Sequence, residues 1–285
     1  MVLEVHPPRE QLRRGKNEVV QRYFRWRIQG NPDPYRVLGR GRPYKILLVL
    51  GHMRSGSSLL THILNANPAI LGYGETHLKY RTEADFKRLL QRVYWRGQEF
   101  RTLQDLGNLC MPHDYVMDKL LHTNKILDGQ ILCSSQVYAL FLLREPQRSL
   151  ASILALKAHL SPEQVLAYYQ ERLATLVEYG RLINDTHRML LLTHADLIHR
   201  TDAVFVALQR VLQTPTGFSE RYEVLKTTGQ RGVGDSEGNI TAGRIVRIQR
   251  PLQQTLPSAI IHQGQIAFQQ CCQQLSSLCT GVDGV

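Results

Sequence analysis

Short apolar runs alternate with longer amphipathic stretches along this chain. The runs "KILLVLG" (45–51), "VYALFLL" (137–143) and "RMLLLTH" (188–194) are strand-sized and apolar at successive positions. Strands of a parallel sheet have this pattern, because helices cover both faces of the sheet. A shorter run, "AILGYGE" (69–75), predicts a further strand, whereas "DYVMDKLLH" (114–122) fits no single pattern.

The stretches between these runs predict helices. Ser161 has a complete helix-start signal, with Pro162 in the first turn and Gln164 three residues after the cap. Leu166, Tyr169, Leu173 and Leu176 would form the buried side of that helix. Further helices are expected over 9–30, 57–66, 82–95, 147–160, from Thr201 onward, and over 256–278. Because strands alternate with helices, we predict an α/β fold with a central parallel sheet flanked by helices.

Composition and charge divide the chain into a short basic segment and one large domain. The 285 residues are 43% hydrophobic and 21% charged, as in a folded protein. The net charge is +11, and residues 1–45 hold eleven Lys and Arg against four Asp and Glu. We therefore expect a basic helical N-terminal arm over 1–43 and a single globular domain over 44–285. The arm would lie over an anionic ligand or a partner subunit, and a homo-oligomer is compatible with the sequence.

The remaining composition bears on compartment and metals. No run approaches the roughly 18–20 apolar residues that span a bilayer, and "MVLEVHPPRE" lacks the apolar region of a signal peptide. A cytoplasmic protein without a transmembrane segment is expected. The five cysteines form no C-x-x-C pair, so free thiols are expected. Cys110 and His113 have a ligand-like spacing but no partner pair, so we expect no metal site.

The segment "GHMRSGSSLLTHIL" (51–64) directly follows a predicted strand and opens a predicted helix. A phosphate-binding loop reads G-x-x-x-x-G-K-[ST] in this context. Gly51 and Gly56 have the required spacing, but Ser57 stands where the lysine belongs and Arg54 lies inside the loop. That lysine contacts the outer phosphates of a nucleotide, so its loss argues against ATP or GTP hydrolysis.

Such a loop suits a ligand with a single 5′-phosphate to which another group is attached. Amides at the start of the helix would bind the phosphate, and the hydroxyls of Ser55, Ser57 and Ser58 would add donors. Asp128 and Asp196 are poor matches for the acidic residue that binds magnesium at a strand end. A magnesium-dependent kinase is therefore disfavoured.

A second motif, "FLLREPQRSLASIL", brings Arg144 to the end of a predicted strand, followed by Pro146 and, on the next helix, Ser152. Ligands of open parallel sheets bind at the carboxyl ends of the strands. Arg144 and the glycine loop are therefore predicted to face one crevice. A third segment, "GQRGVGDSEGN", supplies a glycine-rich loop near the C-terminus.

In this order the motifs resemble those of the PAPS-dependent sulfotransferases (PAPS is 3′-phosphoadenosine-5′-phosphosulfate). The family's first loop reads "PRSGTTL" or "PKSGTTW" and holds the 5′-phosphosulfate. Its second motif, R-[DN]-P with a serine eight residues after the arginine, grips the 3′-phosphate, and its third, R-K-G-x-x-G-D, closes on that phosphate. Gln230 replaces one basic residue of the third motif. The resemblance assigns Arg54, Ser55, Gly56, Ser57 and Ser58 to the first phosphate and Arg144, Ser152, Arg231 and Gly232 to the second.

The resemblance, which covers residues 44–250, also implies the P-loop-like sulfotransferase fold and the chemistry. Sulfuryl transfer proceeds in line, and the protein positions the reactants and stabilises charge. No metal is required, because the transferred group carries one negative charge. Arg54 would neutralise the leaving 5′-phosphate, and the acceptor hydroxyl or amine needs a general base.

Glu75 is the predicted base. "GYGET" is similar to R-[SC]-G-x-E-T of the tyrosylprotein branch, whose acidic residue is the base. His77 is the second candidate, since other branches use histidine. That branch is membrane-anchored, so we expect instead a small-molecule natural product or a glycan as acceptor, as in bacterial tailoring sulfotransferases, which are similar in size and motif order.

Two other functions remain open at this point. A nucleotide-dependent kinase would use the same loop. A basic nucleic-acid-binding protein would use residues 1–45, although no recognisable nucleic-acid module is present and we expect no such partner.

Overall fold

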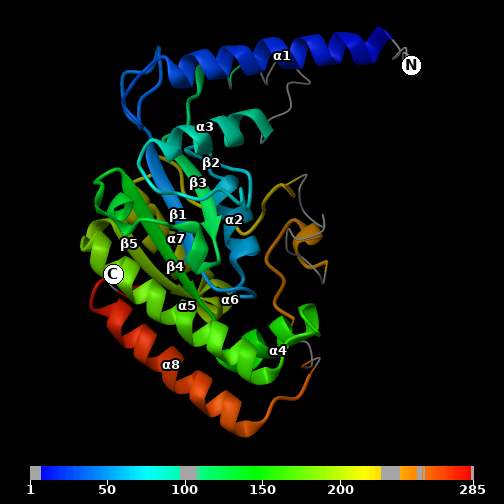
Figure 1. Cartoon of the computed structure of the whole chain (residues 1–285), viewed down its shortest axis with the longest axis vertical. Helices are drawn as coiled ribbons and strands as arrows, with labels where there is room; N and C mark the ends of the chain where they lie inside the picture. Colours follow the sequence, from blue (N-terminus) through cyan, green and yellow to red (C-terminus); the bar gives the residue numbers. More distant parts are fainter. Residues whose placement is uncertain are drawn as a thin grey trace.

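The described part of the chain contains a sheet of five parallel strands with helices on both faces (Figure 1). The computed structural model describes residues 8–96, 107, 109–225, 238–248, 252 and 254–283. Strands lie in the order β2-β3-β1-β4-β5. Their bounds are β1 Lys45–Gly51, β2 Ile70–Gly72, β3 Tyr115–Leu120, β4 Val137–Leu143 and β5 Met189–Thr193. The predicted α/β class with a central parallel sheet is confirmed.

An α-helix precedes β1, and α-helices follow every strand of the sheet except β3. Their bounds are α1 Pro8–Gln29, α2 Ser57–Asn65, α3 Asp85–Arg96, α4 Pro146–Leu156, α5 Pro162–Ile183, α6 His194–His199, α7 Thr201–Leu212 and α8 Ser258–Ser276. The start signal of α5 is confirmed, because the Ser161 side chain accepts from Gln164 N while the Gln164 side chain accepts from Ser161 N. Short 3₁₀ turns, including η2 Thr123–Lys125, fill the connection from β3 to β4.

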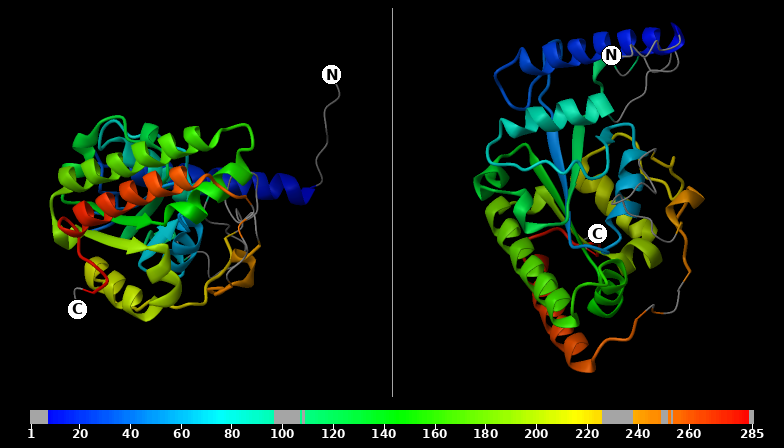
Figure 2. Two further views of the ribbon diagram at one scale, coloured as in Figure 1. Left: turned by 90° about the horizontal axis from the view of Figure 1, so that it is seen from below. Right: turned by 45° about the vertical axis from the view of Figure 1, so that its right-hand side comes forward.

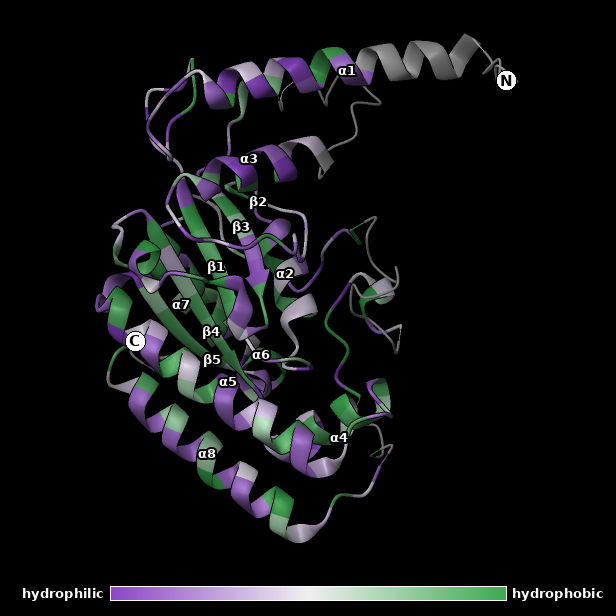
Figure 3. Ribbon diagram, viewed as in Figure 1, coloured by the Kyte–Doolittle hydropathy of each residue, from purple (hydrophilic) through white to green (hydrophobic). Residues whose placement is uncertain are grey.

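Side chains of β1 alternate between two apolar cores. Ile46, Leu48 and Leu50 pack in a core with α3, α5 and α8, whereas Leu47 and Val49 pack in a second core with α2 and α7. A strand period of two residues produces this division. The strands in the middle of the molecule are accordingly the most apolar elements (Figure 3). Both faces of the sheet are therefore covered by apolar side chains, and the charged Asp118 of β3 is an exception within them.

Two strands differ from their sequence patterns. The undecided run 114–122 forms β3, which pairs with β1 from Lys45↔Tyr115 to Leu50↔Leu120. The predicted strand 69–75 is shorter, because β2 ends at Gly72 and Gly74 turns the chain with a φ of 100°. Glu75 consequently lies in a turn beyond the strand.

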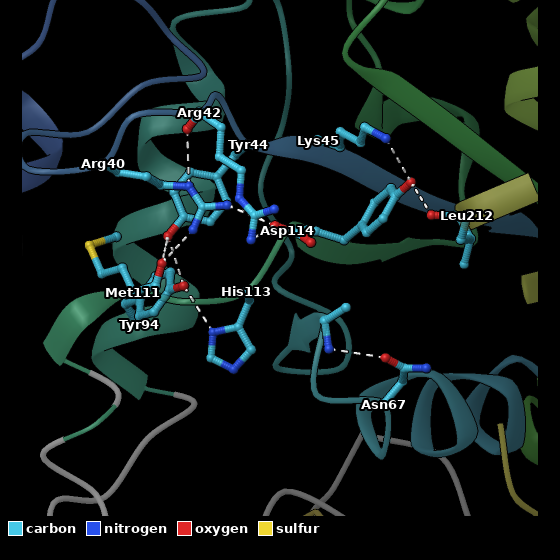
Figure 4. Close-up of polar contacts among 12 residues, drawn as sticks. Arg40, Arg42, Tyr44, Lys45, Asn67, Tyr94, Met111, His113, Asp114 and Leu212 are labelled. Atoms are coloured by element: carbon cyan, nitrogen blue, oxygen red, sulfur yellow. Dashed lines mark hydrogen bonds and ion pairs between the residues drawn. The ribbon is translucent and has the colours of Figure 1, made fainter. Parts of the chain in front are cut away.

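The C-terminal part of α1 joins the rest of the protein at the amino ends of the strands. Phe24 and Ile28 lie in the same apolar core as one face of the sheet, and α1 runs alongside α3 in Figure 1 and in the right-hand view of Figure 2. Beyond α1, Arg40 donates to Met111 O at 2.7 Å and to Asp114 Oδ1 at 3.0 Å (Figure 4). These contacts fix the segment before β1 to the segment before β3. The division into an arm and a domain at residue 43 stays a prediction.

Candidate active site

The glycine loop lies between β1 and α2, as its sequence context predicts. Gly56 precedes α2 with a φ of 95°, a conformation that favours glycine. A Cβ atom there would also lie 2.5 Å from Cδ2 of His194, so both the backbone and the neighbouring imidazole require glycine. The first turn of α2 carries Ser57 and Ser58, whose backbone amides have no acceptor within the helix. An anion is the ligand that such a helix start attracts.

The second motif lies beside the first because β4 pairs with β1. Arg144 follows β4, and its backbone N–H donates to Nε2 of His52 at 3.1 Å. Its Nη1 donates to the carbonyl oxygen of Arg54 at 3.1 Å. Burial lowers the pKa of His52 to about 4, so the imidazole is neutral at physiological pH and accepts this bond. The two predicted motifs therefore meet at one edge of the sheet.

Arg54 reaches from the loop to α4. Its Nε donates to Oγ of Ser152 at 2.6 Å, and its backbone has a φ of 66°. Non-glycine residues rarely adopt this conformation, and such residues cluster at functional sites. The residues predicted to hold opposite ends of one nucleotide thus contact each other directly.

Glu75 comes to the same edge from the turn after β2. Its Oε2 lies 4.0 Å from Nζ of Lys119, and its Oε1 lies 3.4 Å from Nδ1 of His77. The Glu75 side chain is 7% exposed, whereas that of His77 is 60% exposed. Glu75 lines the cavity described below and His77 does not. Of the two predicted bases, Glu75 is the one that lies on the wall of this cavity.

Lys119 is a site residue that the sequence pattern did not reveal. It stands near the end of β3, is buried, and its Nζ lies 3.5 Å from Oγ of Ser58. Burial lowers the pKa of Lys119, and the nearby carboxylates of Glu75 and Asp118 oppose this shift. Had residues 114–122 been assigned as a strand parallel to β1, Lys119 could have been found, because a lysine near the carboxyl end of such a strand lies near the glycine loop.

One cavity of about 680 Å³ joins these groups. Its wall carries more cationic than anionic side chains, namely Arg54, Lys119, Arg144, Arg148, Arg244 and Arg247 against Glu75 and Glu145. The wall is formed by the glycine loop, α2, α4, α6 and residues 238–248, and the right-hand view of Figure 2 shows several of these segments around the strand ends. Its volume suits a small-molecule ligand, and its charge suits an anionic one.

No protein-family model matches this chain, and no curated protein matches it in sequence. Among solved structures, a sulfotransferase from Alicyclobacillus acidocaldarius is similar, with a TM-score of 0.42 and 12% sequence identity. The match covers 84% of this chain and 96% of that protein. At this level of similarity, the function of the chain has to be judged from its own site residues.

The other predicted ligands of the nucleotide differ in their placement. Ser57 and Ser58 line the cavity, but Ser55 is fully buried against Gly51 and is not part of the wall. The predicted contacts of Arg231 and Gly232 lie outside the described residues. Their roles in nucleotide binding, like those of all the other predicted site residues, stay predictions.

The buried side chain of Arg172 contacts two of the strands that carry site residues. Arg172 of α5 is fully buried and donates to the carbonyl oxygen of Gly51 at 2.8 Å and to that of Leu120 at 2.7 Å. These are the last residues of β1 and β3. The guanidinium also lies 5.6 Å from the ring centroid of Tyr179. Arg172 thus links the strand that carries the glycine loop to the strand that carries Lys119.

Within the described ranges, no group of three or more His, Cys, Asp or Glu residues is placed to hold a metal ion. In the same part of the chain, no helix combines the length and apolarity needed to cross a membrane. The five cysteines are all free thiols.

Proposed function

We propose that this protein is a PAPS-dependent sulfotransferase that transfers the sulfuryl group to a hydroxyl or amine of a small molecule or glycan. One observation carries the proposal: two motifs predicted to bind phosphates follow the neighbouring strands β1 and β4 and line one cavity with a mainly cationic wall. Arg144 Nη1 lies 3.1 Å from the Arg54 carbonyl oxygen, and Arg54 Nε lies 2.6 Å from Ser152 Oγ. A donor with two separate phosphate-bearing positions on one nucleoside matches this arrangement.

The residues on the cavity wall suit the donor in their chemistry. Backbone amides at the start of α2 and the hydroxyls of Ser57 and Ser58 offer hydrogen bonds to the 5′-phosphosulfate. Arg54 and Lys119 would stabilise the negative charge that develops on the leaving phosphate and on the sulfuryl oxygens. Arg144 and Ser152 would hold the 3′-phosphate, for which a guanidinium is the preferred partner.

Glu75 would act on the acceptor. In the proposed step a bond forms between the acceptor oxygen and sulfur while the bond from sulfur to the 5′-phosphate oxygen breaks. The acceptor proton passes to the Glu75 carboxylate, and the nucleotide leaves as adenosine 3′,5′-bisphosphate (PAP). The position of Lys119, 4.0 Å from Glu75 and 3.5 Å from Ser58, supports this scheme, since it brings the base and the loop together.

Nucleotide binding tests the proposal without knowledge of the acceptor. We expect PAP, at about 100 times its Kd, to raise the melting temperature by about 5–10 °C. ADP, which lacks the 3′-phosphate, should give a smaller shift at the same concentration. Stabilisation by magnesium-ATP and none by PAP would reject the sulfotransferase in favour of a kinase.

Arg144→Ala tests the second phosphate site. Hydrogen bonds to charged groups contribute about 1.5–3 kcal/mol, so PAP should bind about 10- to 100-fold more weakly. Binding of ADP should change less, because ADP lacks the phosphate that Arg144 is predicted to hold. Calorimetric titration measures both affinities, and Arg181→Ala, which removes an exposed arginine outside the cavity, serves as the control. Equal losses for PAP and ADP would contradict the assignment of Arg144 to the 3′-phosphate.

A further inference from the structure

A fully buried carboxylate lies directly behind the site. Asp118 of β3 precedes Lys119, has no exposed surface, and is paired in register with Leu48 at the centre of the sheet. It accepts four hydrogen bonds. They come from Thr76 N (3.0 Å), Thr76 Oγ1 (2.6 Å), Tyr80 OH (2.6 Å) and its neighbour Lys119 N (2.8 Å). These donors stabilise the charged form and oppose the effect of burial, which raises the pKa of Asp118.

Two of these four bonds hold the residue next to Glu75. Because β2 ends at Gly72, the segment from Gly74 to His77 leaves the sheet, with φ values of 100° and 58° at these two residues. Thr76 is anchored within it at both its amide and its hydroxyl, and the same hydroxyl accepts from Leu78 N at 3.2 Å. Fixing Thr76 limits where the Cα atom of Glu75 can lie, since consecutive Cα atoms are about 3.8 Å apart.

The Asp118 carboxylate therefore connects the segment that carries Glu75 to the strand that carries Lys119. Its Oδ1 accepts from the backbone of Thr76 and from the backbone of Lys119, so the turn that carries Glu75 and the strand that carries Lys119 share one acceptor. The Glu75 and Lys119 side chains then approach to 4.0 Å at the cavity wall.

We infer that Asp118 and Thr76 are positioning residues that set the distance between the base Glu75 and the cation Lys119. This inference rests on the proposed function, because it assigns the network a purpose in sulfuryl transfer. If the network had only a structural role, loss of the Thr76 hydroxyl and loss of the Tyr80 hydroxyl would affect turnover equally. Substitution of Tyr80 therefore distinguishes a positioning role from a structural one. The Tyr80 hydroxyl donates to the same Oδ2 atom as Thr76 Oγ1, but Tyr80 lies outside the turn and is tied to Ile126 by a β-bridge.

Thr76→Val and Tyr80→Phe form the matched pair of variants. Each removes one hydroxyl donor from Asp118 Oδ2. We expect both to lower the melting temperature, Thr76→Val somewhat more, because the Thr76 hydroxyl also accepts from Leu78 N. Turnover is measured as formation of labelled 2-naphthyl sulfate from labelled PAPS and 2-naphthol, and as release of labelled sulfate when water is the acceptor. We expect Thr76→Val to lower kcat by about 10- to 100-fold, since small misplacements of catalytic groups have effects of this size. KM for PAPS and Kd for PAP should stay near the wild-type values, and Thr76→Ser should restore kcat. Tyr80→Phe should retain kcat.

A second readout needs no turnover. The pKa of Lys119, followed by NMR of labelled lysine, is raised by the Glu75 carboxylate and should fall when that carboxylate moves away. We expect a lower pKa in Thr76→Val and in Glu75→Gln, and the wild-type pKa in Tyr80→Phe. Asp118→Asn, which keeps the side-chain shape, gives the same test if Thr76→Val does not fold: a wild-type kcat there would overturn the inference.

The outcomes distinguish the inference from the proposed function. A wild-type protein that neither binds PAP nor releases sulfate from PAPS would refute the sulfotransferase itself. An active wild type in which Thr76→Val and Tyr80→Phe lose kcat equally, or in which Thr76→Val leaves both kcat and the pKa of Lys119 unchanged, would overturn the positioning role alone.

Discussion

Glu75→Gln is expected to lower kcat by about 100- to 10,000-fold, the usual contribution of a general base. The amide keeps the shape of the side chain but has no carboxylate oxygen to accept the acceptor's proton. The wild-type group stands on the cavity wall, 4.0 Å from Lys119 Nζ. Affinity for PAP should stay close to wild type, because Glu75 is assigned no contact with the nucleotide.

Steady-state transfer from labelled PAPS gives kcat, and calorimetric titration gives the affinity for PAP. His77→Asn is the control, since asparagine tolerates the positive φ of this residue and His77 is mostly exposed. Its kcat should remain within about threefold of wild type, as for substitutions of solvent-facing groups. If Glu75→Gln stayed active while His77→Asn lost turnover, the base would be His77.

Arg54→Met should reduce kcat/KM by about 100- to 1,000-fold, as removal of a single charge-stabilising donor does in other enzymes. The guanidinium stands on the glycine loop and donates to Ser152, so it lies between the two predicted phosphate positions. Its loss would remove charge stabilisation from the leaving phosphate and leave Ser152 without this partner. Arg54→Lys should recover part of the loss, because a lysine restores the charge but not the planar donor group.

The matched control is Arg148→Met, which removes another cation from the same cavity wall. The Arg148 side chain is 34% exposed and pairs with Glu145 across 3.8 Å at the start of α4. We expect kcat/KM to fall by less than about fivefold, in line with the small free energy of exposed ion pairs. Equal losses in the two variants would show that the total charge of the cavity matters and that Arg54 has no specific role.

Periodicity predicted most of the fold because its signals are local. Apolar runs of β1, β4 and β5 and the cap at Ser161 depend on neighbouring residues only. The run 114–122 was undecided because Asp118 and Lys119 interrupt its apolar pattern. Both are buried in β3, and the partners that offset their burial, Thr76 and Tyr80 for Asp118, lie about 40 residues earlier in the chain. In a sequence, charged residues indicate an exposed position unless such buried partners are known.

The candidate site shows the same limit. Two motifs could be placed together from sequence, because the carboxyl ends of parallel strands share one edge. Lys119 could not be placed beside them from sequence, since residues 114–122 had not been assigned as a strand. Arg172 was missed for a related reason: it lies on the predicted apolar side of α5, between Tyr169 and Leu173, where a cation is unexpected. Its partners are backbone carbonyl groups, which leave no trace in sequence.

The contacts of Arg172 have a consequence for natural and engineered variation. A single side chain of α5 bonds to the terminal carbonyl groups of both β1 and β3, so the spacing between the glycine loop and Lys119 is set partly from outside the cavity. Helix α5 in turn packs along α8, where Cys271 Sγ donates to Leu173 O. Repacking of this remote helix pair would therefore alter the geometry of the reacting groups, even when every residue that touches the ligands is kept.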